Sequence, residues 1–148
     1  MNLKEKINID LKDAMKSGDK VRLSVVRSIR ALILEFEKSG SAKELTPEIG
    51  LQMLTTAAKK RKDSIEQFRN AGRNDLAESE ESELNILMSY LPKQLDESEI
   101  TDEIKRLAES IGAKSKGDFV KLMPLVMKEL KGKADGKLVK SIVENFLV

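Results

Sequence analysis

The stretch that decides the fold class is residues 19–36, which read DKVRLSVVRSIRALILEF. Apolar residues recur there at steps of three and four, the spacing that places side chains on one face of an α-helix. That face consists of Val21, Val25, Ile29, Leu32 and Phe36, and Leu23, Val26 and Ile33 widen it. Asp19 stands where a helix N-cap is expected. We therefore predict a central helix with a broad buried face.

Helical periodicity also covers the rest of the chain, and no alternating pattern typical of strands competes with it. Start and stop signals place helices from Leu3 to Ser17, from Asp19, from Thr46 to about Ala71, from Asn74 to Pro92, from Asp96 to Ile111, from about Asp118 to Leu130, and from Asp135. The expected N-caps of five of these helices are Asp19, Thr46, Asn74, Asp96 and Asp135. Met15 and Ile111 are expected on inward faces. Residues 39–45 form a polar loop, and Pro124 predicts a kink or a late start in the sixth helix.

The predicted fold is all-α and multihelical, in two subdomains of about four and about three helices. Pro92 is the best boundary, so residues 1–91 form the N-terminal subdomain and residues 96–148 the C-terminal one. Lys93-Gln94-Leu95 is interpreted as a short hinge. The second subdomain is short for independent stability, so we expect it to pack on the first or on a partner.

The residue types that are missing exclude several kinds of site. The chain has no Cys and no His, which removes disulfides, thiolate metal sites, the commonest zinc ligand and the usual general base. Lys114-Ser115-Lys116 is the only triplet that suggests a Ser–Lys nucleophile, and Ser115 is better explained as a helix cap. No glycine-rich phosphate loop is present. We predict no catalytic residue, no cofactor and no metal.

The location of the protein is predicted from two absences. The segment Met1–Lys16 is charged throughout and has no apolar core of a secretory signal. No run approaches the roughly 18 apolar residues that a membrane span needs. A soluble, cytoplasmic protein without membrane contact is the expectation.

Charge is distributed unevenly along the chain, although its net value is only +2. Residues 53–74 carry six basic and two acidic groups, residues 75–103 one and ten, and residues 104–148 ten and five. Polarised surfaces of this kind steer partners. The acidic run of Glu78, Glu80, Glu81 and Glu83 is interpreted as a solvated helix face that could pair with basic residues elsewhere in the chain.

The first candidate binding residues are Lys59, Lys62, Arg69 and Arg73, which fall on one stripe of the third predicted helix. Such a stripe can follow a phosphate backbone. The alternative is an ordinary wet face with pairs such as Lys62 and Glu66, and the residues alone favour it. Arg61 shares the apolar stripe, so we predict a snorkelling or salt-bridged edge residue.

The second candidate set is Lys128, Lys131, Lys133, Lys137 and Lys140, around a glycine turn that leads into a helix. Free N–H groups at a helix start suit an anion, but Asp135 as N-cap would use some of them. Phosphate contact and a purely structural turn both stand at this point. Every Phe is expected to face inward, which leaves recognition of shape and phosphate rather than of stacked bases.

Four separated motifs resemble one protein family. They are KRKDS at 60–64, NAGRNDL at 70–76, YLPKQL at 90–95 and KGKADGKLV at 131–139. Together and in this order they look like the GatB/YqeY family, over essentially the whole chain. Pro124 departs from the pattern expected of the helix that contains it.

The resemblance implies a two-part helical fold, similar to the tail region of the B subunit of tRNA-dependent amidotransferase. That enzyme amidates glutamate or aspartate mischarged on tRNA, with ammonia from glutamine. Its reaction site lies in a domain that this chain lacks, whereas its helical and tail regions engage the tRNA. Residues 127–139 are most like the tail. A family label of carbon–nitrogen ligase with glutamine as amido-N-donor would describe the complex.

Two functions follow as hypotheses. The first is a tRNA-binding or amidotransferase-associated module without catalytic activity of its own, whose partners are tRNA and an amidotransferase or aminoacyl-tRNA synthetase component. The second is a protein–protein adaptor that uses its acidic segment, residues 75–103. An autonomous amide-forming enzyme is the least favoured possibility.

Overall fold

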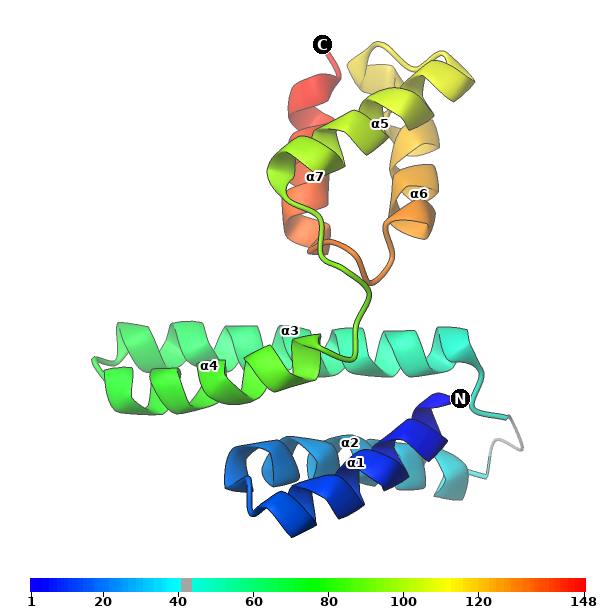
Figure 1. Cartoon of the computed structure of the whole chain (residues 1–148). Helices are drawn as coiled ribbons and strands as arrows, with labels where there is room; N and C mark the ends of the chain where they lie inside the picture. Colours follow the sequence, from blue (N-terminus) through cyan, green and yellow to red (C-terminus); the bar gives the residue numbers. More distant parts are fainter. Residues whose placement is uncertain (41–43) are drawn as a thin grey trace. The chain divides into compact units, whose positions relative to one another are not determined.

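The computed structural model describes residues 1–40 and 44–148, and within them the chain is helical without strands (Figure 1). The helices are α1 (Leu3–Ser17), α2 (Lys20–Lys38), α3 (Pro47–Asn70), α4 (Asn74–Met88), α5 (Glu97–Ile111), α6 (Phe119–Glu129) and α7 (Gly136–Phe146), with a 3₁₀ turn η1 (Lys116–Asp118) before α6. The predicted all-α, multihelical class is confirmed. Residues 41–43 of the predicted polar loop lie outside the described residues.

The chain forms two compact units, Met1–Leu91 with α1 to α4 and Pro92–Val148 with α5 to α7. Each unit has its own hydrophobic core. The first is built from Ile7, Val25, Val26, Ile29, Ile33, Leu54, Ala58 and Leu87. The second is built from Ile100, Ile104, Leu107, Ala108, Ala113, Leu122, Val126, Leu130, Val139, Val143 and Leu147. Aliphatic residues at helical spacing therefore account for both cores, as the scarcity of aromatic residues requires.

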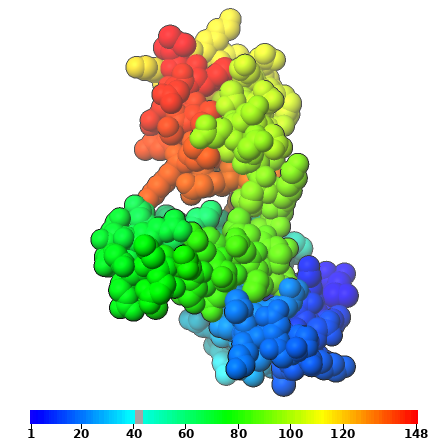
Figure 2. All heavy atoms as spheres, turned by 60° about the vertical axis from the view of Figure 1, so that its left-hand side comes forward, coloured from blue at the N-terminus to red at the C-terminus, as the bar shows by residue number. Residues whose placement is uncertain are grey.

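In the first unit, the long helix α3 packs along α4, and α1 packs on α2 (Figure 1). Helix α2 also contacts α4, and Figure 2 shows the blue N-terminal helices directly against the green surface of α4. Tyr90 follows α4, and its hydroxyl donates to Asp10 of α1. The Lys6 ammonium lies 5.0 Å from the centre of the Tyr90 ring. These contacts attach the end of the first unit to its first helix.

Three residues expected on inward faces are exposed. Met15 is 58% exposed, Val21 41% and Ile111 44%. Each lies in the first or last turn of its helix, where fewer neighbouring elements cover a side chain. The prediction of their burial was wrong for this reason, while the middle turns of the same helices follow the periodicity.

The helix starts confirm most of the predicted caps. The side chains of Asp19, Thr46 and Asp96 accept hydrogen bonds from backbone amides three residues later. The prediction of Asn74 as a cap was wrong by one residue, because Arg73 occupies the N-cap position of α4. The preceding turn through Gly72, whose φ is 73°, leaves one residue between it and α4.

Helix α6 begins at Phe119, within one residue of the predicted start, so the late start suggested by Pro124 does not occur. The 3₁₀ turn η1 precedes it, and Pro124 lies inside the helix, where it has no amide to donate to Val120. Ser115 is the N-cap of η1, and the Asp118 carboxylate accepts from the amides of Lys114 and Ser115. These backbone hydrogen bonds lower the pKa of Asp118.

Among the described helices, none combines the length and the apolar character required to cross a lipid bilayer.

Candidate nucleic-acid interface

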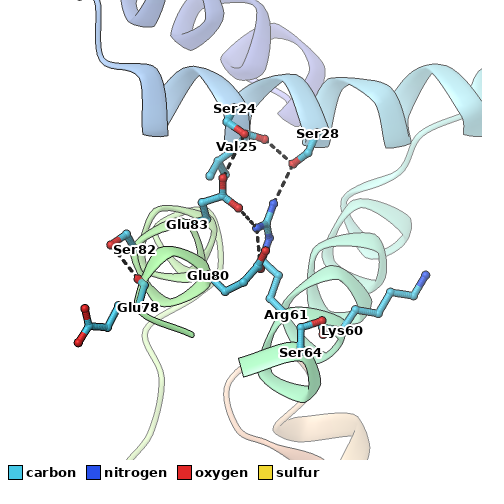
Figure 3. Close-up of polar contacts among 10 residues, drawn as sticks. All are labelled: Ser24, Val25, Ser28, Lys60, Arg61, Ser64, Glu78, Glu80, Ser82 and Glu83. Atoms are coloured by element: carbon cyan, nitrogen blue, oxygen red, sulfur yellow. Dashed lines mark hydrogen bonds and ion pairs between the residues drawn. The ribbon is translucent and has the colours of Figure 1, made fainter. Parts of the chain in front are cut away.

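Arg61 of α3 stands at the junction of three helices of the first unit (Figure 3). Its Nη1 donates to Glu80 Oε2 at 3.3 Å and to Glu83, and its Nη2 donates to Ser28 Oγ of α2 at 3.4 Å. Ser24 Oγ of α2 also donates to Glu83 Oε1, at 3.1 Å. The side chain of Arg61 is only 17% exposed. The prediction of a salt-bridged edge residue is confirmed, and the sequence did not reveal its partners.

The acidic residues of α4 have partners inside the chain. Besides Glu80 and Glu83, Glu81 pairs with Arg69. Asp75 pairs with Arg73 at 3.2 Å. The close guanidinium of Arg73 lowers the pKa of Asp75 by its hydrogen bond. Much of the negative charge of α4 therefore neutralises the positive charge of α3.

The first candidate stripe is consequently divided. Lys59 and Lys62 are exposed and form no ion pair within the part of the chain that the structure describes, and Lys62 is not paired with Glu66. Arg69 lies in the last turn of α3, whereas Arg73 lies beyond that helix, at the N-cap of α4, so the prediction that Arg73 continues the stripe was wrong. The chain turns at Gly72 between the two residues, and carboxylates hold both guanidinium groups. Only the lysine half of the stripe is unpaired.

The second candidate set surrounds the connection between α6 and α7. Lys128 is in the last turn of α6, Lys131 and Lys133 are in the connecting loop, and Lys137 and Lys140 are on α7. All five side chains are exposed. Lys140 Nζ lies 3.9 Å from Glu144 Oε1, and the other four lysines form no ion pair with any described residue. The second set is therefore less neutralised than the first.

The loop between α6 and α7 is a tight turn. Gly132 is buried with a φ of 76°, a conformation that favours glycine. The amide of Lys133 donates to the Leu130 carbonyl at 2.9 Å. Asp135 occupies the N-cap position of α7, but its side chain accepts no capping hydrogen bond. In this conformation the Asp135 side chain therefore does not compete with an anion for the free backbone amides at the start of α7.

Sequence reasoning missed the contacts of the segment before α5. The predicted hinge, Lys93-Gln94-Leu95, is attached to the loop: Gln94 Nε2 donates to the Gly132 carbonyl at 2.7 Å, and the Leu95 amide donates to the Lys133 carbonyl at 2.9 Å. An irregular segment has no periodicity from which such contacts could be predicted. The only signal in this segment was the polar amide of Gln94, which stands between Lys93 and the apolar Leu95.

Across residues 1–40 and 44–148, no three carboxylates gather closely enough to hold a metal ion. Within the same ranges, no buried side-chain nitrogen or oxygen lacks a hydrogen-bond partner.

Comparison with known proteins identifies the family. The model of the YqeY-like protein family matches residues 4–147, nearly the whole chain. The chain belongs to the YqeY-like family. The resemblance in the four sequence motifs is thereby confirmed at the level of the family.

Among its relatives, this YqeY-like chain is 36% identical over 134 residues to a protein of Pyrenophora tritici-repentis named Altered inheritance of mitochondria protein 41, mitochondrial. That match covers 87% of this chain and 71% of the relative. An uncharacterized protein of Schizosaccharomyces pombe is 40% identical over 94 residues, which cover 62% of this chain and 74% of the relative. A Saccharomyces cerevisiae protein with the same name as the first is 28% identical over 130 residues, covering 86% and 68%.

Proposed function

We propose that this YqeY-like protein is a tRNA-binding module, without catalytic activity of its own, that works in association with a tRNA amidotransferase. One observation carries the RNA-binding part. Lys128, Lys131, Lys133 and Lys137 are exposed within ten residues of chain and have no ion-pair partner among the described residues. Four unpaired cations so close in sequence suit a polyanion.

The chemistry of these lysines favours phosphate. Each ammonium that replaces a condensed counterion on a nucleic acid gains affinity through release of that ion. The start of α7 adds amides that Asp135 does not cap, together with the positive end of the helix dipole. Phe119 and Phe146 are partly buried against the core of the second unit. Recognition through shape and phosphate is therefore favoured over stacking on bases.

The first unit would contribute less. Lys59 and Lys62 are available, whereas Arg69 and Arg73 would have to exchange carboxylates for phosphates. Exposed ion pairs contribute only about 0–1 kcal/mol to stability, so breaking them to bind phosphate costs little free energy. The exchange also adds little affinity, because one ion pair replaces another. We therefore assign the main contacts to Lys128, Lys131, Lys133, Lys137 and Lys140, and supporting ones to the first stripe.

The association with amidotransferase rests on the resemblance to the tail region of its B subunit, and an aminoacyl-tRNA synthetase component is the other partner we propose. The cytoplasmic location remains a prediction. Two of the relatives described above are named as mitochondrial proteins.

The test is a fluorescence-anisotropy titration of the full chain with tRNA and with duplex DNA of equal charge, at several salt concentrations. We expect binding that weakens steeply with salt, with a slope of about 0.9 per phosphate contact. We also expect preference for tRNA, because the proposed surface recognises the shape of folded RNA. Failure to bind tRNA even in the lowest salt would contradict the proposal.

A pull-down with the same purified chain distinguishes the protein–protein adaptor from the tRNA-binding module. Asp75, Glu80, Glu81 and Glu83 already have partners in the chain, which leaves less of the 75–103 segment for a basic protein. A protein recovered with the chain in stoichiometric amount after nuclease treatment, and lost when Glu78 and Glu97 are changed to lysine, would favour the adaptor.

A further inference from the structure

The loop between α6 and α7, which carries proposed RNA-binding lysines, is hydrogen-bonded to the segment that precedes α5. Gln94 Nε2 donates to the Gly132 carbonyl at 2.7 Å and to the Pro92 carbonyl at 2.8 Å. The Leu95 amide donates to the Lys133 carbonyl at 2.9 Å. All of these atoms belong to the second unit. The loop is thus joined by two hydrogen bonds to a segment almost 40 residues earlier in the sequence.

The chemistry of Gln94 fits this position. Both acceptors are carbonyl oxygens, so they require a donor, and an amide nitrogen carries two hydrogens, one for each. A glutamate of the same length can only accept when ionised. Leu95 beside it packs against the core of the second unit, which fixes the segment by apolar contact as well.

The carbonyls of Gly132 and Lys133, which accept from Gln94 and Leu95, both belong to the basic loop between α6 and α7. Gly132 is buried, while Lys131 and Lys133 on either side are exposed. The contact with Gln94 is therefore on the inner side of the loop, and the ammonium groups are on the outer side. Gly132 also has a φ of 76°. If the loop changed this backbone conformation, the Gly132 carbonyl would point elsewhere and could no longer accept from Gln94.

We propose that Gln94 is a positioning residue for the RNA-binding surface: it holds the α6–α7 loop in the conformation in which Lys131, Lys133 and Lys137 meet phosphates. This inference rests on the proposed function. Gln94 touches no phosphate itself. RNA binding and the loop conformation are coupled, and such coupling is reciprocal. RNA bound to the lysines therefore also stabilises the hydrogen bond between Leu95 and Lys133.

The first test replaces Gln94 by methionine, which keeps the length of the side chain and removes both hydrogen bonds. If the competent loop conformation falls to between a third and a tenth of the population, the apparent affinity for tRNA falls about three- to tenfold. The slope of log affinity against log salt stays unchanged, because no phosphate contact is removed. Gln52→Met is the matched control, because Gln52 is exposed in the first unit and its side chain forms no hydrogen bond with any residue that the structure describes.

The second test measures hydrogen exchange at the Leu95 amide by NMR. Free Gln94→Met should exchange this amide faster than the free wild-type chain, and tRNA should slow the exchange in the wild type. A merely structural role would speed exchange without any change in affinity.

The outcomes separate this inference from the proposed function. If the wild-type chain does not bind tRNA, the proposed function and the inference fall together. If the wild type binds and Gln94→Met binds equally well, only the inference is overturned. A loss of affinity with a lowered salt slope would also overturn it, since Gln94 would then act as part of the contact surface.

Discussion

Replacing Lys131, Lys133 and Lys137 together by alanine is expected to weaken tRNA binding about 500-fold at 0.1 M salt. Each lost phosphate contact lowers the salt slope by about 0.9, and three contacts over the tenfold range from 1 M to 0.1 M amount to about 2.7 powers of ten. The expected slope falls by the same amount, about 2.7. The measurement is the anisotropy titration described above. The three lysines are exposed and form no ion pair with any of the residues 1–40 and 44–148, so the variant should fold normally.

The matched control is the triple alanine variant of Lys105, Lys114 and Lys121. These lysines are exposed in the same unit and form no ion pair within the described residues, so the net charge changes equally. We expect its salt slope to stay close to that of the wild type. Equal losses in both variants would mean that general charge, and not the α6–α7 connection, determines binding.

Replacing Arg61 by methionine is expected to destabilise the first unit by about 2 kcal/mol. Breaking a fully buried ion pair costs about 3–5 kcal/mol and breaking an exposed one less than about 1 kcal/mol. Arg61 and Glu83 are between these limits, with 17% and 21% of their side chains exposed. The loss arises because Glu80 and Glu83 keep their charge without a partner. Urea unfolding, followed by NMR signals from α2 and α4, measures it.

Two further variants test this explanation. Arg69→Met breaks a more exposed pair, since Arg69 is 53% exposed, and should cost less than about 1 kcal/mol. Adding Glu83→Gln to Arg61→Met should recover part of the lost stability, because it removes one uncompensated charge. If Arg61→Met and Arg69→Met lower the free energy of unfolding equally, the partly buried ion pairs of Arg61 do not stabilise the three-helix junction more than an exposed pair does.

The helices themselves could be predicted from the sequence, because periodicity and caps are local signals. Asp19, Thr46 and Asp96 cap helices where the pattern predicted them. The errors arose at the ends. Met15 is exposed because it lies in the last turn of α1, and Asn74 lost the cap position to Arg73.

The candidate site was predictable in composition but not in its pairing. The lysines and arginines were evident, but whether each is free depends on which carboxylate the fold brings near. Packing of α4 on α3 places Glu81 beside Arg69, twelve residues away in sequence. The contact between Gln94 and Gly132 spans 38 residues and joins two irregular segments. No local pattern encodes such a contact.

The most direct measurement of the central claim is a two-dimensional NMR map of the isotopically labelled full chain during titration with tRNA. We expect the largest chemical-shift changes at residues 128–140 and at Leu95, with smaller ones near Lys59 and Lys62. The amides of α4, whose acidic groups repel phosphate, should hardly change. Shifts concentrated on α4, or none around the α6–α7 loop when tRNA is saturating, would contradict it.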